Sequence, residues 1–283
     1  MTHAIYDTKR NGLYRDKVQD FFVDRLVRTE SMAESHYHPY YELFYVVKGT
    51  CRMFVGHSLF ILSQGELVIL PPSTLHRTQY EDKVERITLS FTETYLENIK
   101  SILGKDFFKT NVQMGKMTFN SNSRVKLEEN FDELLYESRK NDEFSEINRK
   151  SCLLKLLIQI ARNSDGRNER EQLIGETEAS IQKAARFIFE NYEKDISLEQ
   201  AAQIAGMRDT YFSRKFQEVT GYGFKEYLTN IRLQHSQEML LNGQLTITQI
   251  ALACGFTNSN YFGDAFKKHT GQSPREFRKQ QTD

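Results

Sequence analysis

A helix-forming segment near the C-terminus occurs twice, and this repeat limits the fold more than any other feature of the 283-residue chain. Residues 197–206 (SLEQAAQIAG) are echoed by residues 246–255 (TITQIALACG), and residues 211–216 (YFSRKF) by residues 261–266 (YFGDAF). A short helix, a turn and a second helix, built twice, can contact two neighbouring segments of a DNA groove.

Both copies carry signals for the start and the end of a helix. Serine or threonine followed three residues later by glutamine forms a capping box, which satisfies the N–H groups at a helix start. These pairs are Ser197 with Gln200 and Thr246 with Gln249. Glycine at 206 and at 255 suits the left-handed residue that follows a helix. Alanines within each first helix allow a second helix to cross closely, which favours a helix-turn-helix unit.

The second helix of each copy divides into an apolar face, carrying Phe212 and Phe216 or Phe262 and Phe266, and a polar face. Short polar groups with Arg or Lys read base edges and phosphates, although any amphipathic helix has one solvated face. We predict that the polar faces contact DNA through Thr210, Ser213, Arg214 and Gln217 in the first copy and through Asn260, Gly263, Asp264 and Lys267 in the second.

Residues 224–241 are predicted to form a helix between the copies. At ~1.5 Å per residue its length is roughly 27 Å, and this spacer can set two recognition helices about one DNA turn apart, on the order of 34 Å.

Residues 178–280 resemble the AraC/XylS family of bacterial transcription regulators. The matching stretches include 206–216, 224–233, 250–256, 259–262 and 270–278 (TGQSPREFR), of which the last is the most specific. The resemblance implies two helix-turn-helix units in adjacent major grooves, and it adds Ser259 to the base contacts of the second unit. Asp264 departs from the basic or neutral residue of many members. We therefore expect the second unit to read fewer bases and Arg214 to be the stronger anchor, with Lys267, Lys268 and Arg278 as candidate backbone contacts.

The overall charge gives no sign of nucleic-acid binding. Lys and Arg together number 38, as do Asp and Glu, so the net charge is zero. Between residues 208 and 279 basic residues are only slightly in excess. A few well-placed cations must therefore supply the attraction to phosphate, which implies modest affinity and a need for a dimer.

The N-terminal half is predicted to be rich in short strands. Segments dense in Val, Ile, Phe and Tyr, bounded by glycine or proline, occupy residues 21–27, 42–47, 51–55, 67–70 and 86–91. Many short strands with glycine turns favour a small barrel or jelly roll. The predicted fold class is thus α+β multidomain, with a cupin-like β-barrel ahead of an all-α domain.

A histidine-rich motif lies among these strands. His36, His38 and Glu42 have the same parity, so one strand would send all three to one face. Their spacing, followed by Gly49, Gly65, Pro71 and His76, resembles the cupin family, although Ser73 and Tyr80 replace the usual glycine and asparagine. The resemblance implies a pocket for a small polar molecule, such as a sugar.

Three interpretations of this motif stay open. His36, His38, Tyr40, Glu42 and His76 are candidate ligand-binding residues in a mouth lined by the aromatic residues Tyr40, Tyr41 and Phe44. The three histidines with Glu42 also form a plausible divalent metal site, which would allow a metal-dependent cupin enzyme carrying a DNA-binding tail. Alternatively, the histidines serve barrel packing only. For the whole protein, a further alternative is a constitutive DNA-binding protein whose barrel only mediates dimerisation. We expect no required cofactor and no catalytic residues.

The remaining segments complete the predicted organisation. Leucine-rich helical stripes in 123–138 and 147–161 indicate a pair of helices, and 163–171 is polar and turn-rich. We predict an effector-binding domain at 1–120, a helical dimerisation segment at 121–163, a linker at 164–177 and a DNA-binding domain at 178–283.

Three scattered cysteines, no secretory signal and no membrane-spanning run favour a cytoplasmic protein. The expected function is a ligand-responsive transcription regulator, not an enzyme. It would act as a homodimer on double-stranded promoter DNA, and would contact RNA polymerase if it is an activator.

Overall fold

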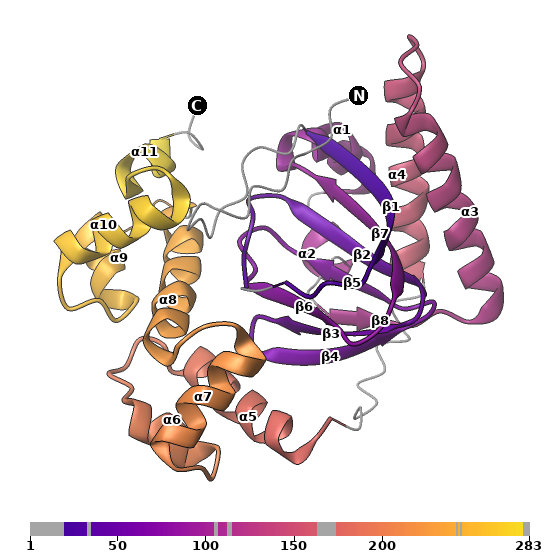
Figure 1. The fold of residues 1–283 in the computed structure, drawn as a ribbon. Coiled ribbons are helices and arrows are strands. Elements are labelled where there is room, and N and C mark those ends of the chain that lie inside the picture. The colour runs from indigo at the N-terminus through magenta and orange to yellow at the C-terminus, as the bar shows by residue number, and fades with distance from the viewer. Residues whose placement is uncertain are drawn as a thin grey trace.

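The computed structural model describes residues 20–32, 35–104, 107–111, 115–162, 174–241, 243 and 245–279. A β-sandwich lies at the centre, with helices α3 (Ser121–Ser138) and α4 (Ser145–Arg162) against one side (Figure 1). A C-terminal helical domain, formed by residues 174–279, lies on the other side. Within the described residues, no helix combines the length and the hydropathy that crossing a membrane requires.

The β-sandwich consists of two antiparallel sheets, in the strand orders β1-β7-β2-β5-β8 and β4-β3-β6. The strands are β1 (Phe21–Arg28), β2 (Tyr41–Lys48), β3 (Thr50–Val55), β4 (Ser58–Ser63), β5 (Leu67–Leu70), β6 (His76–Tyr80), β7 (Val84–Phe91) and β8 (Gly115–Met117). The predicted α+β class is confirmed, but closure of the strands into one barrel is wrong. The pairing of β2 with β7 shifts between Val46 and Lys48. Such a bulge bends the strand, and the chain then passes through Gly49 into the other sheet.

Strand β2 is covered on both faces, so every residue from Glu42 to Val46 is buried. Leu43 and Tyr45 pack with helices α1 (Glu93–Leu103), α3 and α4, whereas Phe44 and Val46 face the smaller sheet. Helix α2 (Phe107–Asn111) adds Phe108 to the first cluster. Successive side chains of a strand point to opposite faces, so a single strand serves two cores.

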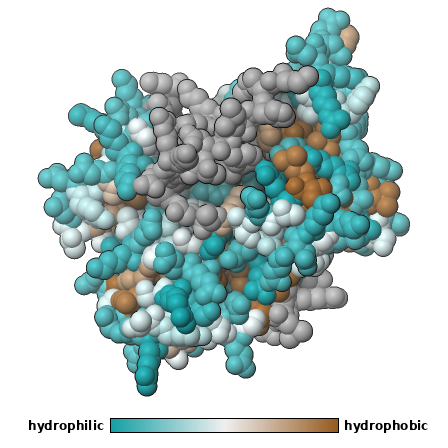
Figure 2. All heavy atoms as spheres, viewed as in Figure 1, coloured by the Kyte–Doolittle hydropathy of each residue, from teal (hydrophilic) through white to brown (hydrophobic). Residues whose placement is uncertain are grey.

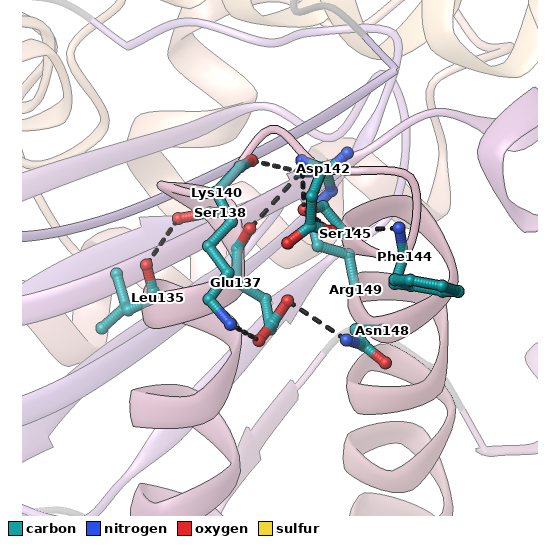
Figure 3. Close-up of polar contacts among 9 residues, drawn as sticks. All are labelled: Leu135, Glu137, Ser138, Lys140, Asp142, Phe144, Ser145, Asn148 and Arg149. Carbon is teal, nitrogen blue, oxygen red and sulfur yellow. Dashed lines mark hydrogen bonds and ion pairs between the residues drawn. The ribbon is translucent and has the colours of Figure 1, made fainter.

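The turn between α3 and α4 holds these helices together (Figure 3). Asp142 Oδ1 accepts hydrogen bonds from Ser145 Oγ at 2.8 Å and from the Phe144 N–H at 3.0 Å, which satisfies a free N–H group at the start of α4. Glu137, which is buried near the end of α3, pairs with Lys140 Nζ at 3.1 Å and accepts from Asn148 Nδ2 at 3.3 Å. These contacts fix the angle at which α4 leaves the turn.

The outer face of the smaller sheet packs against the C-terminal helical domain. Phe54 and Leu59 belong to the same buried cluster as Phe212 and Tyr227. The Tyr227 hydroxyl also donates to the Gly56 carbonyl oxygen at 2.7 Å. The two halves of the chain therefore share an apolar core.

The C-terminal helical domain contains α5 (Glu176–Glu190), α6 (Leu198–Ile204), α7 (Asp209–Thr220), α8 (Phe224–Leu241), α9 (Ile247–Ala253), α10 (Ser259–Thr270) and α11 (Pro274–Lys279). Helix α8 has the bounds that the sequence predicts. Its Ile231 packs in the cluster around α6 and α7, while Leu233 and Leu240 pack in a separate cluster around α9 and α10. Of the predicted linker, residues 164–173 lie outside the described residues, and α5 begins at Glu176.

The surface in view is mostly hydrophilic, with an apolar patch over β1 (Figure 2). Phe22, Leu26 and Val27 are exposed there. Strand β1 forms one edge of the larger sheet, so this patch lies beside backbone groups that the sheet leaves unpaired.

A second contact between the two halves joins the segment before β2 to the end of α10. The Tyr37 ring stacks on the His269 ring with centroids 3.7 Å apart, and the Tyr37 hydroxyl donates to the His269 carbonyl oxygen. Burial lowers the pKa of His269 to about 3, so this imidazole is neutral near pH 7.

We predict that acid destabilises the fold through His269. The pKa of its side chain is about 3 in the folded chain and about 6.5 in an unfolded chain. The unfolded state binds more protons between these values, so the stabilisation is complete above pH 6.5 and decreases as the pH falls. The expected loss is about 1.4 kcal/mol per pH unit, or roughly 2 kcal/mol at pH 5. Urea unfolding of wild type and His269→Phe measures it, because the variant keeps a ring without the titration. Equal pH slopes for the two proteins would contradict the prediction.

Candidate nucleic-acid interface and ligand site

Helix α7 presents the first predicted recognition face to solvent. Its apolar residues Phe212 and Phe216 are fully buried, so the opposite face turns outward. The predicted contact residues there are all exposed: Thr210, Ser213, Arg214 and Gln217. The Arg214 guanidinium lies 5.5 Å from the centre of the exposed Tyr211 ring. Tyr211 recurs as the exposed Tyr261 on α10, and the sequence prediction named neither tyrosine as a contact.

Helix α10 presents the second face in the same way. Phe262 and Phe266 are fully buried, Gly263 is half-buried, and the other predicted contacts are exposed: Ser259, Asn260, Asp264, Lys267 and Lys268. Asn258 is the N-cap, and its side chain accepts from the Asn260 N–H at 2.8 Å. The sequence prediction overlooked Asn258, although an asparagine just before an apolar-periodic run is a usual cap signal.

The first helix of each unit supports these faces. The two predicted capping boxes are both present, at the starts of α6 and α9. Gly206 and Gly255 follow these helices with φ of 67° and 80°, as the sequence predicts. Ala202 and Ala251 are buried and let the recognition helix approach closely. Each unit therefore holds an exposed polar face on a rigid pair of helices.

Inside the β-sandwich, three histidines form a cluster. One ring nitrogen from each of His36, His38 and His76 lies within 4.8 Å of the other two. Nδ1 of His38 lies 2.9 Å from the Tyr40 carbonyl oxygen, and Nδ1 of His76 lies 2.9 Å from the Thr74 carbonyl oxygen. A carbonyl oxygen only accepts, so both Nδ1 atoms donate and both Nε2 atoms are acceptors when the rings are neutral. This arrangement is the one that metal-ligating histidines usually have.

Glu42 extends the histidine cluster. Its Oε2 lies 3.3 Å from His38 Nε2. Burial alone would raise the pKa of Glu42, but the contact with His38, the positive charges that His38 and His76 carry when protonated, and the charge of Arg86 outweigh it and lower the pKa to about 2. The carboxylate is therefore ionised and available to a cation or a hydroxyl group. The four residues that the sequence pattern selected do lie together, although residues 39–40 form a bend between the histidines and β2.

The aromatic residues are divided differently from the prediction. Tyr40 stacks on His38 with ring centroids 4.0 Å apart, so it belongs to the site. Tyr41 does not, because odd-numbered residues of β2 face the helices; its ring packs against Phe91 and Phe108. Phe44 faces the sandwich interior.

A buried ion pair beside the cluster was missed by the sequence prediction. Arg86 NH1 lies 3.1 Å from Asp24 Oδ1, and the guanidinium lies 5.5 Å from the Phe44 ring centre. Burial raises the pKa of Asp24 although Arg86 opposes the shift. The polar alternation of Arg86, Thr88 and Ser90 within β7 is the signal that would have indicated a polar interior face.

Comparison with known proteins matches both halves of the chain. Residues 201–280 match the model of a helix-turn-helix domain, and residues 27–157 match that of an AraC-like ligand binding domain. The uncharacterized HTH-type transcriptional regulator YijO of Escherichia coli is 36% identical over 109 residues, which cover 38% of this chain and 38% of that relative. The Msm operon regulatory protein of Streptococcus mutans is 23% identical over 244 residues, or 85% of this chain and 84% of that one.

Among solved structures, an apo ToxT variant from Vibrio cholerae aligns over 93% of this chain and 98% of its own, with 15% identity and a TM-score of 0.40. The relatives named above are regulators, and nothing in them supports the alternative of a metal-dependent enzyme. The chain thus combines an AraC-like ligand-binding domain with a C-terminal helix-turn-helix domain of the AraC type.

Proposed function

We propose that this protein is a sequence-specific transcription regulator, and not an enzyme. It binds double-stranded promoter DNA through α7 and α10 and responds to a small molecule held in the β-sandwich. The observation that carries the proposal is the pair of solvent-facing recognition helices on identically capped units, joined by α8. This function places the protein in the cytoplasm, with RNA polymerase as a partner if it activates transcription.

The two recognition helices contribute unequally to DNA binding. Helix α7 offers an exposed arginine, which can donate two hydrogen bonds to guanine. Helix α10 offers Asn260 for adenine and Asp264, which repels phosphate and can accept from cytosine N4. Gly263 supplies no side chain. Lys267 and Lys268 lie on the exposed side of the last turn of α10 and suit phosphate contacts.

Arg214→Ala should weaken specific DNA binding by roughly 1–3 kcal/mol, because a bidentate contact to a base is lost. Lys225→Ala is the matched control, since Lys225 is exposed and lies on α8, outside both recognition helices. Gel-shift titration on a selected duplex, at fixed salt, measures both. An unchanged affinity for Arg214→Ala would remove this residue from base recognition.

We propose that the effector binds at His36, His38, Tyr40, Glu42 and His76. An ionised carboxylate, imidazole nitrogens and a stacked aromatic ring suit a polar metabolite such as a sugar. The Nδ1 contacts to backbone carbonyls favour a second occupant, a divalent cation. The histidines and Glu42 would hold such a cation, which would supply a Lewis-acid contact to an effector oxygen.

His38→Ala combined with Glu42→Ala should abolish the ligand response while leaving DNA binding intact, because the altered atoms lie inside the sandwich. The measurement is the shift in melting temperature with Zn²⁺ and with a panel of sugars and other polar metabolites, followed by gel shift. Tyr41→Phe is the control, since Tyr41 faces away from the cluster. A double variant that fails to fold would support a packing role for these residues instead.

We propose that the protein acts as a homodimer through the segment 121–163. Helix α4 carries Ile147, Ser151, Leu154 and Ile158 at helical spacing, and Ile147 is 66% exposed. A second copy of this stripe would cover the apolar residues. Paired subunits would also compensate for the small number of exposed cations in each DNA-binding domain.

Ile147→Glu should convert the dimer to a monomer, since a carboxylate in an apolar interface loses its hydration. Sedimentation velocity at micromolar concentration measures the change. Ile102→Glu, at a 67% exposed position of α1 outside this segment, is the control. A wild-type chain that sediments as a monomer would end the proposal, as would an Ile147→Glu variant that stays dimeric.

A further inference from the structure

Four consecutive residues lie between the histidine cluster and both helix-turn-helix units. His36 and His38 contribute their rings to the cluster. Ser35 and Tyr37 instead contact the C-terminal helical domain. The backbone of His36 pairs with that of His76 in an antiparallel bridge, so this segment is extended and its side chains alternate. We call residues 35–38 the coupling segment.

Ser35 holds the end of α7. Its hydroxyl donates to the carbonyl oxygen of Thr220, the last residue of that helix, and its own carbonyl oxygen accepts from the Tyr222 hydroxyl at 2.6 Å. Arg77, next to His76 on β6, donates to the Glu218 carbonyl oxygen at 2.8 Å. These bonds satisfy carbonyl groups that the last turn of a helix leaves without intrahelical partners.

Tyr37 holds the end of α10. Its hydroxyl donates to the His269 carbonyl oxygen and its ring stacks on the His269 imidazole, with an angle of 16° between the ring planes. Both side chains are almost completely buried. Ser35 and Tyr37 thus attach one short segment of the β-sandwich to the C-terminal ends of both recognition helices.

The coupling segment packs tightly against the residue that follows α7 but not against the residue that follows α10. Gly221, which follows α7 with φ of 83°, lies so close that an added Cβ would be 2.6 Å from Ser35 Oγ and 2.9 Å from Ser35 N. Gly271, which follows α10 with φ of 79°, would meet nothing within 4 Å. The first unit is therefore held by direct backbone packing, and the second by the Tyr37 side chain.

We infer that the coupling segment is the mechanical link between the ligand site and the DNA-binding units. The two units have separate cores and are joined by α8. Their relative position therefore depends on the contacts made by the C-terminal ends of α7 and α10. A change at the histidine cluster moves residues 36 and 38, and the same backbone carries the groups that hold α7 and α10. By thermodynamic linkage, DNA binding must then change the free energy of ligand binding at the cluster by the same amount that ligand binding changes the free energy of DNA binding. The inference rests on the proposed function in taking the cluster as the ligand site.

A reversible crosslink tests the link. In Ser35→Cys with Gly221→Cys, the Cβ of residue 221 lies near the position of the sulfur on residue 35, at a separation compatible with a disulfide. The three natural cysteines are buried. The reduced protein is its own control, because it carries the same backbone strain at residue 221. We expect mild oxidation to crosslink most of the protein, as seen by its mobility on a non-reducing gel. Failure of the folded double variant to crosslink would overturn the inference.

The coupling itself is measured by adding His76→Ala, a cluster change remote in sequence from the crosslink. We expect this change to alter the crosslinking rate at least threefold. It should alter affinity for a selected duplex at least threefold in the reduced protein and less than 1.5-fold in the oxidised protein. Thr78→Val, buried on the same side of β6, is the control and should do neither. An unaltered crosslinking rate, or equal effects of His76→Ala in both redox states, would overturn the inference.

A second variant covers the case in which cysteine at 221 prevents folding. Tyr37→Phe removes only the hydroxyl that donates to α10, and Tyr41→Phe, whose ring packs away from the histidine cluster, is its control. Hydrogen exchange of the peptide spanning 262–270 should accelerate at least threefold in Tyr37→Phe alone, and unchanged exchange would overturn the inference. Failure of the proposed function looks different: the protein would bind no duplex or no small molecule, while the crosslinking rate would still respond to His76→Ala.

Discussion

Burial of the outer face of the smaller sheet is the interaction on which the rest of the structure depends. Phe54 and Leu59 would be exposed if the C-terminal helical domain moved away, and Tyr227, whose ring centre lies 6.2 Å from that of Phe54, would lose part of its cover. Exposing each large apolar side chain costs about 1.5–3 kcal/mol. To separate the two halves completely, an effector would have to offset several of these costs. It could do so only by binding the separated state more tightly than the joined state. Local rearrangement at the polar contacts of Ser35 and Tyr37 requires much less.

The separate cores of the two units explain why the recognition faces are available for DNA. Phe212 and Phe216 anchor α7, and Phe262 and Phe266 anchor α10, so the polar sides of both helices have no alternative but to face solvent. The contacts to the β-sandwich are at the C-terminal ends of these helices, near Thr220 and His269. Residues near the N-terminal ends, such as Thr210 and Asn260, stay exposed. Control and recognition thus use opposite ends of the same helices.

The sequence predicted the C-terminal domain far better than the β-sandwich, for a physical reason. Caps, glycines and apolar periodicity are local signals, and they located α6 to α10 and the bounds of α8. Strand β6 was missed because its alternation of His76, Thr78 and Tyr80 with Arg77 and Gln79 contains few residues typical of strands. Tyr41 was grouped with the mouth residues although it is adjacent to Glu42 in β2, and successive side chains of a strand point to opposite faces. The stacking of Tyr37 on His269 joins residues 232 positions apart, and no local signal reports it.

The scarcity of exposed cations makes geometry decisive for binding. A domain with a large basic surface tolerates a misplaced unit, because phosphate attraction acts over roughly a Debye length of 8–10 Å. Here the net charge is zero, and a few groups such as Arg214, Lys267 and Lys268 must meet DNA at the same time. When two sites bind one target, the second contributes only if the connection lets both reach it together. A small displacement of α10 relative to α7 therefore changes affinity strongly, and a segment that touches the ends of both helices is well placed to produce it.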